Sequence, residues 1–569
     1  MSRFLARRSR TVTLLFAAAV LLCARPVSAQ WVQESYALTA GWNAIWLSHD
    51  CSYTSIDTLL TAQPRVLEVW QWNPLASTTQ FVSTPAAPAA SDAEWKVWRR
   101  GNPAASTLAA FAGNSAYLIR VADGNALTLS LTGAPLPPKY AFKSTGLNLI
   151  GFPMQTPASS TDRNIERFLS FSEVLKTSPP VFAYRGGALS AVTPKNPVQV
   201  TTPRTTALAR NAAYWVNRAE QTEYDGPLRV QVLGSRLDFG DSLNTVTVRI
   251  KNVVDLSKNQ TVTATLGVAS SATPPTGQPA VAGAVPLLIR GALDPNTQQF
   301  TYAPLTGPIT RSIGPGEEIE VQLTLNRPAL GATAGQVFQS LLQISDSLNL
   351  TRVDLGVRAI STSFTGVWVG GAVVNKVDQI IGQTTAAVQA APSNFPLRLI
   401  LHRAEAGPTT LLQQGYLFDA SGTPMVTTKE SVAQGGSKKI TRVSSASFPL
   451  DLVLQGTGQL GPTGTVTFNV ALGHNAITNP FVHTYHPDHD NLDARYEPLA
   501  PGVESPNVTR VIQLTFSPTL AGVSDPTFGS TTLGGTYSET ITGLRAEPIT
   551  VSGAFVIRRI SAAQSLLTQ

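Results

Sequence analysis

The sequence predicts an all-β chain with minor α-helix, built from several β-sandwich or Ig-like domains in tandem. Three observations favour this class. Glycine (43 residues) and proline (40 residues) are plentiful, charged residues make up only 14% of the chain, and valine and threonine recur in alternation with other residues. Alternation with period two is typical of strands that bury one face, and glycine and proline are typical of the turns between strands.

The first 29 residues have the pattern of a secretory signal peptide. A basic start, MSRFLARRSR, precedes a short apolar core, and small residues precede a cleavage point after Ala29. This order of basic, apolar and small residues is that of a leader which is removed after export. We therefore expect an exported protein, located in the periplasm, at the cell surface or outside the cell.

Charge and cysteine content restrict the protein further. Five of the 42 basic residues lie in the leader, which leaves 37 basic against 35 acidic residues and a net charge of +2. So small a charge does not favour a nucleic-acid partner. Only Cys51 follows the leader, so we expect no internal disulfide, and no later apolar run is long enough to predict a transmembrane helix.

An internal repeat predicts that residues 30–139 and 140–227 are two copies of a small β-rich domain. The stretch LTAGWNAIWL near the start of the first copy matches KSTGLNLIGF in the second, and NSAYLIRV matches NAAYWVNR near their ends. Between these stretches each copy has a short run with apolar residues at helical spacing, followed by an aromatic strand. A repeat unit as long as a whole small domain indicates a domain duplication rather than a short solenoid repeat.

Residues 228–360 predict an Ig-like sandwich. NTVTVRIKNV and EEIEVQLTL alternate apolar and polar residues, and FQSLLQISDSLNLTRVDLGVRA has the form of a hairpin that ends the domain. Residues 361–569 contain at least eight strand-like runs and predict one large sandwich or barrel. Within it, GTGQLG (456–461) matches a dinucleotide-binding pattern, but a second strand follows where that fold requires a helix, so we interpret it as a glycine-rich hairpin.

Tryptophans are concentrated in the first repeat, and two of them suggest a binding face. Trp70 and Trp72 share one face of the predicted strand VLEVWQW. If these rings were exposed, they could stack on sugar rings and bind an extracellular glycan. The alternative is that they form the core of a small domain, where aromatic side chains supply most of the buried area. The second copy favours this core interpretation, because it has Leu147 in place of Trp42.

One long connection, NPFVHTYHPDHDNLDARY, concentrates histidine and aspartate between two predicted strands. Imidazole and carboxylate groups suit zinc, and the oxygen-rich run suits calcium, so a structural Ca or Zn ion is one hypothesis. A catalytic metal is a second, a loop held by side-chain hydrogen bonds to the backbone is a third, and a loop that is simply solvated is a fourth. The candidate ligands are His483, His486, Asp488, His489, Asp490 and Asp493.

The C-terminal region resembles a terminal β-domain of uncharacterised, exported and modular bacterial proteins that carry Ig-like domains. The resemblance rests on FTGVWVGGAVVNKV, on the YHPDHDN string, and on GGTYSETITGL with ITVSGAFVIRRI. It implies an exported, modular β-protein and assigns no ligand or catalytic residue.

The sequence therefore favours a non-enzymatic, exported protein with a surface, adhesion or scaffold role and with glycans or surface proteins as partners. Two alternatives stay open. One is an array of carbohydrate-binding modules that uses Trp70 and Trp72, and the other is a metal-dependent hydrolase built on the His/Asp connection. The sequence lacks the G-x-S-x-G, H-E-x-x-H and P-loop patterns that would favour catalysis.

Overall fold

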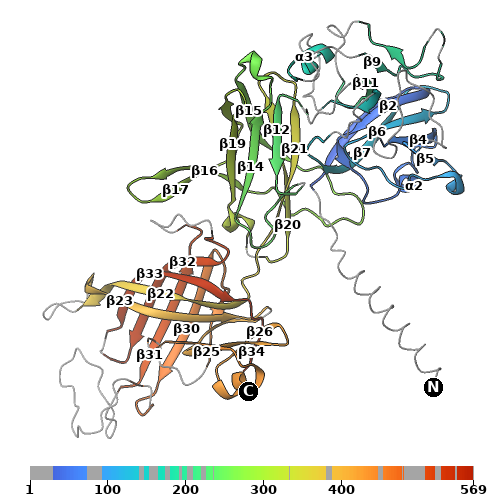
Figure 1. Ribbon diagram of the computed structural model, residues 1–569. Helices are drawn as coiled ribbons and strands as arrows, with labels where there is room; N and C mark the ends of the chain where they lie inside the picture. The colour runs from blue at the N-terminus through green and yellow to red at the C-terminus, as the bar shows by residue number, and fades with distance from the viewer. Residues whose placement is uncertain are drawn as a thin grey trace, which may run out of the picture.

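The computed structural model shows a chain made largely of strands, as the sequence predicts. Figure 1 shows the repeat region, a two-sheet sandwich and a C-terminal sheet in a row, with the sandwich in the middle. The structure describes residues 30–73, 93–139, 146–152, 164–173, 180–190, 192, 195–201, 209–218, 224, 226–234, 236–331, 333–379, 387–405, 407–445, 447, 453–476, 479, 506–519, 527–544 and 547–567. Among these residues, no helix is long and apolar enough to cross a membrane.

The two repeat copies form four-stranded sheets with the same strand order. In the first copy the order is β2-β6-β4-β5, and in the second it is β8-β11-β9-β10. A short helix follows the first strand of each sheet, and the side chains of Ser55 and Asn164 cap these helices by accepting backbone N–H bonds. The sheet strands and helices are β2 (Gly41–Leu47), α2 (Ile56–Leu59), β4 (Val66–Trp72), β5 (Trp95–Arg99), β6 (Ser115–Val121), β8 (Gly146–Ile150), α3 (Ile165–Ser170), β9 (Val181–Ala183), β10 (Val198–Gln199) and β11 (Tyr214–Arg218).

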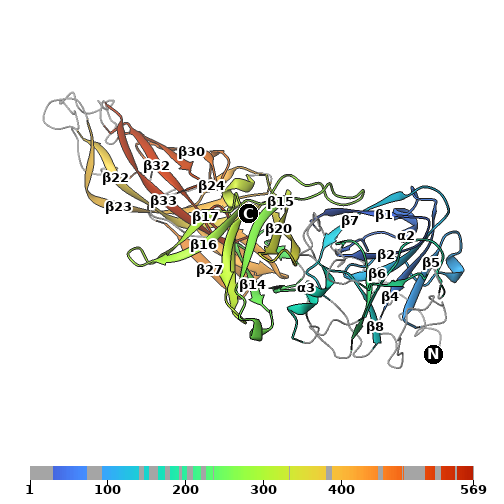
Figure 2. The same cartoon turned by 90° about the horizontal axis from the view of Figure 1, so that it is seen from above.

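A further sheet of the first copy lies against the sandwich. It consists of β1 (Val32–Leu38), β3 (His49–Asp50) and β7 (Leu127–Pro135), with β7 in the middle. Trp31, which precedes β1, accepts a backbone N–H bond from Ala272 of the sandwich and donates its own N–H to the Ser271 hydroxyl. The three-stranded sheet therefore joins the repeat region to the sandwich, as Figure 2 shows from above.

The sandwich consists of two five-stranded sheets that enclose one apolar core. Their strand orders are β12-β14-β19-β16-β17 and β13-β21-β20-β15-β18. The predicted alternation sets the core: in the strand EIEVQLTL, Val321, Leu323 and Leu325 are buried while the two glutamates are exposed. The strands are β12 (Leu228–Val232), β13 (Leu237–Asp238), β14 (Thr245–Asn252), β15 (Val262–Ser270), β16 (Leu287–Asp294), β17 (Gln299–Pro304), β18 (Ile309–Ile313), β19 (Glu318–Leu325), β20 (Val337–Asp346) and β21 (Arg352–Ile360), with single 3-10 turns at Leu256–Lys258 and Arg327–Leu330.

The C-terminal region is a meander of antiparallel strands that closes on itself. The strand order is β28-β24-β23-β22-β33-β32-β31-β30-β29. The two edge strands, β28 and β29, are separated only by Gly456, so residues 454–458 pair with β24 on one side and with β30 on the other. The strands are β22 (Gly366–Gln379), β23 (Ala387–Arg403), β24 (Thr409–Leu411), β28 (Leu454–Gln455), β29 (Thr457–Gly458), β30 (Gly464–Leu472), β31 (Val508–Phe516), β32 (Thr532–Thr542) and β33 (Ile549–Ser561).

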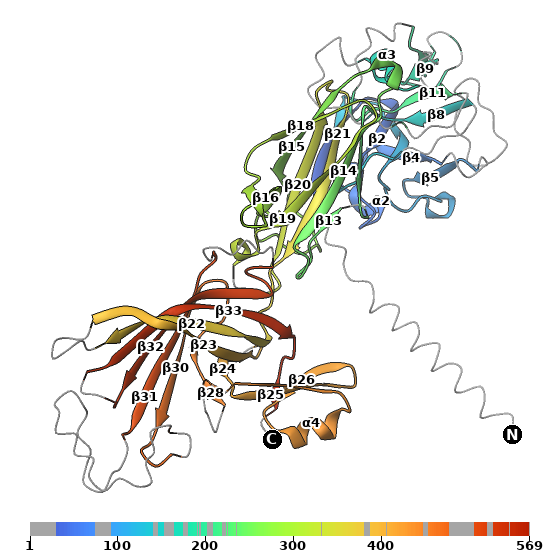
Figure 3. The same cartoon turned by 60° about the vertical axis from the view of Figure 1, so that its left-hand side comes forward.

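Of the two architectures that the sequence predicts for residues 361–569, a sandwich or a barrel, the closed sheet corresponds to the barrel. One face of its strands encloses a packed core that includes Trp368, Phe468 and Phe555. The GTGQLG stretch supplies β29 and the start of the turn in the antiparallel hairpin β29–β30, in agreement with its interpretation as a glycine-rich hairpin. A four-stranded sheet of β25 (Gln414–Ala420), β26 (Thr423–Thr427), β27 (Ile440–Ser444) and the C-terminal β34 (Leu566–Leu567) has the order β27-β25-β26-β34. Figure 3 shows β25, β26 and the helix α4 (Glu430–Gly436) beside the closed sheet.

Candidate functional site

The His/Asp connection begins and ends at one place on the closed sheet. Its candidate ligands His483, His486, Asp488, His489, Asp490 and Asp493 lie outside the described residues. The ends of the connection are described. The amide of Asn479 donates to the carbonyls of Gly473 (3.0 Å) and Pro506 (2.9 Å), and the backbone N–H of His474 donates to the Asn507 side chain (2.7 Å).

These bonds form a neck that holds the two ends of the connection together. Asn479 is only 3% exposed, and a Cβ added to Gly543 in the β32–β33 turn would lie 1.9 Å from the Asn507 carbonyl oxygen. Buried amide–carbonyl bonds of this kind are costly to break, because they leave unpaired polar groups behind. The neck therefore fixes the entry and exit of the connection, while the structural Ca or Zn ion stays a prediction.

Trp70 and Trp72 are buried, which contradicts the exposure that a sugar-stacking face requires. Their exposed fractions are 4% and 5%. Trp72 meets Trp215 of the second repeat copy edge to face, with ring centroids 5.0 Å apart, and Trp95 packs against both rings. Since each ring already packs against its neighbours, the carbohydrate-binding hypothesis for this pair is wrong, and its alternative, a packed aromatic core, describes these residues.

The aromatic core belongs to both copies of the repeat at once. Leu147, Leu149 and Trp215 from the second copy pack into the same cluster as the tryptophans of the first. Backbone hydrogen bonds also cross between the copies, from Trp42 N–H to the Gly187 carbonyl (2.8 Å) and from Trp46 N–H to the Asn211 carbonyl (3.0 Å). The two copies therefore form one packed unit, and separating them would expose the tryptophan faces to water.

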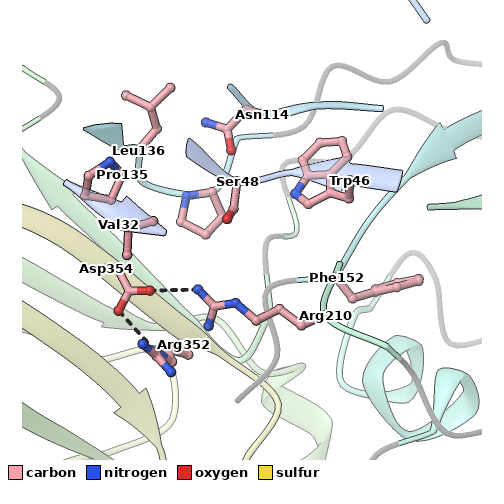
Figure 4. Close-up of a pocket in the computed structure, with 11 residues that line it drawn as sticks. Val32, Trp46, Ser48, Asn114, Pro135, Leu136, Phe152, Arg210, Arg352 and Asp354 are labelled. Atoms are coloured by element: carbon pink, nitrogen blue, oxygen red, sulfur yellow. Dashed lines mark hydrogen bonds and ion pairs between the residues drawn. The ribbon is translucent and has the colours of Figure 1, made fainter. Parts of the chain in front are cut away.

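A buried set of charges joins this unit to the sandwich (Figure 4). Arg210, from the turn before β11, contacts Asp354 of β21 at 2.7 Å and Glu34 of β1 at 3.3 Å. Arg352 contacts the other oxygen of Asp354 at 3.1 Å. The side chains of Arg210 and Asp354 are 7% and 4% exposed, so both are buried charges that need counter-ions, and their mutual contact is the shortest of these pairs.

Sequence reasoning missed Arg210, although the repeat contains a signal for it. When Asn114 of the first copy is matched to Asn211 of the second, Arg210 corresponds to Gly113. A charged residue that replaces glycine at a matched position indicates a contact which only one copy makes. The sequence has no comparable signal for Asp354, because an aspartate in a strand is expected to face solvent until its partner is known.

The same junction contains a buried histidine and a small cavity. His49 of β3 is fully buried, and burial lowers its pKa to about 4, with Arg210 acting in the same direction and the Leu131 carbonyl and Asp354 opposing. His49 is therefore neutral at ordinary pH. The cavity, lined among others by Ser48, Asn114 and Arg210, has a volume of about 20 Å³, which suffices for one water molecule.

A much larger cavity lies between the sandwich and the closed sheet. Its volume is about 590 Å³, within the usual range for small-molecule sites. The sandwich and the linker supply Asp241, Thr333, Ala334, Gly335, Ile360, Ser361, Ser363, Phe364 and Thr365, and the closed sheet supplies Arg403, Glu405 and Gln459. We call this cavity the junction cleft.

The junction cleft is lined by three charged residues, and sequence reasoning also missed its cation, Arg403. Leu399 and Leu401 of β23 point into the core of the closed sheet, and Arg403 continues the same alternation at the end of the strand. Burial lowers the pKa of Arg403. The sequence did contain a signal for Arg403, because a cation occupies a position that the alternation of its strand assigns to the inward face. In the part of the chain that the structure describes, no group of three or more His, Cys, Asp or Glu side chains could hold a metal ion.

Comparisons with known proteins add no function. No protein-family model matches the chain, and no curated protein matches it. Among solved structures, the chain is similar to a DUF4466 family protein from Parabacteroides merdae ATCC 43184, at 9% identity over 58% of this chain and 99% of that one, with a TM-score of 0.16. It is also similar to a protein of unknown function from Bacteroides ovatus, at 8% identity over 59% and 96%, with a TM-score of 0.15. Scores this low support no argument about fold or function.

Proposed function

We propose that this chain is an exported, non-catalytic β-protein that acts at the cell surface or outside the cell as a scaffold or adhesive spacer. The observation that carries the proposal is the locking of neighbouring units by buried contacts. The repeat copies share one aromatic core, and the Arg210–Asp354 pair joins that unit to the sandwich. A spacer needs such fixed junctions, because free linkers would let its units swing independently.

The junction between the sandwich and the closed sheet gives the same support. Arg559 of β33 donates to the Ser363 carbonyl at 2.6 Å, and the Ser530 hydroxyl lies 3.5 Å from the Asn244 side chain. A Cβ added to Gly529 would lie 2.2 Å from Pro328 Cγ, so the two surfaces fit closely there. Both ends of the sandwich thus make specific contacts, which is what a spacer requires.

Two measurements test the proposal. Fractionation of the native cells should place an epitope-tagged chain at the surface or in the medium, with the leader removed after Ala29. Purified protein beginning at Gln30 should show no turnover on a panel of polysaccharides, esters and peptides. A cytoplasmic location, or robust hydrolysis that is abolished by His486→Ala, would overturn the scaffold role and favour the metal-dependent hydrolase.

A further inference from the structure

The junction cleft contains a half-buried cation, Arg403, that has no counter-ion among the residues that the structure describes. One terminal nitrogen of Arg403 (Nη1) donates to the Leu460 carbonyl at 2.8 Å, and its other N–H groups have no partner among the described residues. No ion pair reaches it there, and burial alone accounts for the lowering of its pKa. A partly desolvated arginine that faces a cavity with its remaining N–H groups unpaired among the described residues points to an anion that binds there.

Two nearby arginines show what a compensated cation looks like in this region. Arg327 is 2% exposed and donates to several backbone carbonyls, among them Phe239 (3.0 Å) and Leu243 (2.7 Å). Arg559 donates to the Ser363 carbonyl. The carboxylate of Asp241 acts on the pKa values of both. Arg403 has neither this set of acceptors nor the influence of Asp241, so it differs from its neighbours.

The rest of the cleft suits a ligand that carries hydroxyl groups. The carboxylates of Asp241 and Glu405 line the cavity, and Asp241 lies close enough to Arg327 and Arg559 to act on their pKa values. The exposed side chains of Thr333, from the sandwich, and of Gln459, from the closed sheet, also line the cleft. Carboxylates accept hydrogen bonds from sugar hydroxyls, and amide and hydroxyl groups can donate or accept them. A single carboxylate on the ligand would match the fork of the guanidinium.

We propose that the junction cleft binds an acidic saccharide of the uronic-acid class, with the sugar carboxylate on Arg403 and the sugar hydroxyls on Asp241, Glu405 and Gln459. The cavity of about 590 Å³ accommodates one or two sugar rings. The ligand could be a free sugar acid or one residue of an acidic polysaccharide, since the recognising chemistry is the same. This inference does not depend on the scaffold role and is lost or kept independently of it.

Isothermal titration of the purified chain beginning at Gln30 tests the proposal. The probes are galacturonate, a short oligogalacturonate, neutral galactose, and a peptide whose only anion is its terminal carboxylate. Low ionic strength is needed because salt weakens exposed charge pairs. We expect saturable binding of the uronates and none of galactose. Tighter binding of the oligomer than of the monomer would identify a polysaccharide as the source.

Variants on one strand give a matched comparison. Arg403→Gln should weaken uronate binding about tenfold or more, as expected for the loss of a charge-assisted pair. Arg403→Lys keeps the charge without the fork and should give intermediate affinity. Arg398→Gln is the control, because Arg398 lies on the same strand but is exposed and donates to the Ser444 carbonyl (3.2 Å) outside the cleft. Circular dichroism checks that each variant is folded.

Several results would overturn the proposal. These are no saturable uronate binding to the folded wild type, equal binding by Arg403→Gln and wild type, equal binding of galactose, or a preference for the peptide. If the Arg403 variants misfold, hydrogen exchange of the wild-type protein with and without uronate tests the proposal instead. Uronate should slow hydrogen exchange in the linker Ser361–Thr365, which lines the cleft, and unchanged exchange there would place any binding elsewhere.

Discussion

Asp354→Asn should destabilise the junction between the repeat pair and the sandwich. The substitution keeps the size of the side chain and removes its charge. Arg210 then loses its 2.7 Å partner in a site where both side chains are less than 10% exposed. Arg352 loses its 3.1 Å partner as well, but it is 22% exposed, so water can replace that contact. The cost therefore falls mainly on Arg210.

The expected loss of stability is about 3 kcal/mol. Removing one partner of a buried ion pair costs about 3–5 kcal/mol, because the remaining charge stays desolvated. The lower end applies because Glu34 still lies 3.3 Å from Arg210 and partly neutralises it. For a cooperative unit of this size, about 2–4 °C of Tm corresponds to each kcal/mol, which predicts a fall of roughly 6–12 °C.

Differential scanning calorimetry, which records the unfolding of every unit, measures this change, and tryptophan fluorescence assigns the transition of the repeat pair. Eight of the nine tryptophans precede residue 228, so the signal reports on the repeat pair. The matched control is Glu320→Gln, which breaks the Arg249–Glu320 pair (2.9 Å) on the same sandwich. That pair is about half exposed, so its loss should cost less than about 1 kcal/mol.

A second variant separates the pair itself from its surroundings. Arg210→Met combined with Asp354→Leu should recover part of the loss, because no charge is then left buried without a partner. The reasoning is refuted if Asp354→Asn melts within about 1 °C of the wild type, since about 3 kcal/mol would shift the midpoint far more. It is also refuted if Asp354→Asn and Glu320→Gln cost the same.

Three further predictions concern other parts of the chain. The pKa of His49 is lowered to about 4 in the folded state. As the pH drops, the unfolded state therefore takes up this proton before the folded state does. The free energy of unfolding should fall by about 3 kcal/mol between pH 6.5 and pH 4. His49→Leu should flatten that part of the stability curve from urea titrations, and an unchanged slope would contradict the assignment. Gly151→Ala should destabilise the repeat pair by about 1–3 kcal/mol through overpacking, because the new Cβ would lie 2.0 Å from the Trp46 ring. Gly267→Ala is its control in thermal melts, since the nearest atom there is 4.0 Å away, and equal effects would count against the close fit. Asn479→Ala should speed hydrogen exchange at the neck, because amide–carbonyl bonds of this side chain hold the neck. A chelator should leave exchange there unchanged. Faster exchange with the chelator would instead indicate the structural ion that was one of the hypotheses for the connection.

Local patterns in the sequence were enough for the fold class. Alternation with period two tells which residues of a strand share a face, and this holds in the sandwich, where Val321, Leu323 and Leu325 are buried as their spacing predicts. The match between the two repeat copies predicts that they fold alike, and their sheets do have the same strand order. Neither inference requires knowledge of contacts between distant residues.

The candidate site could not be predicted in the same way. The sequence places Trp70 and Trp72 on one face but does not say what covers that face, and the cover is Trp95 together with Trp215 from the other copy. The alternation of its strand indicates that Arg403 lies on the inward face. The lack of a counter-ion among the described residues could not be read from the sequence, because it depends on which carboxylates lie nearby in the fold.

Strand periodicity and turn residues act within a few positions of the chain, so the sequence alone predicts a tandem of β-domains with a duplicated start. Which surfaces remain available depends on contacts that form only in the folded chain. Arg210 and Asp354 are 144 positions apart, and residues 454–458 close a sheet whose other strands come from both sides of them in the sequence. Burial and charge compensation depend on neighbours in space, and spacing along the chain contains no information about those neighbours.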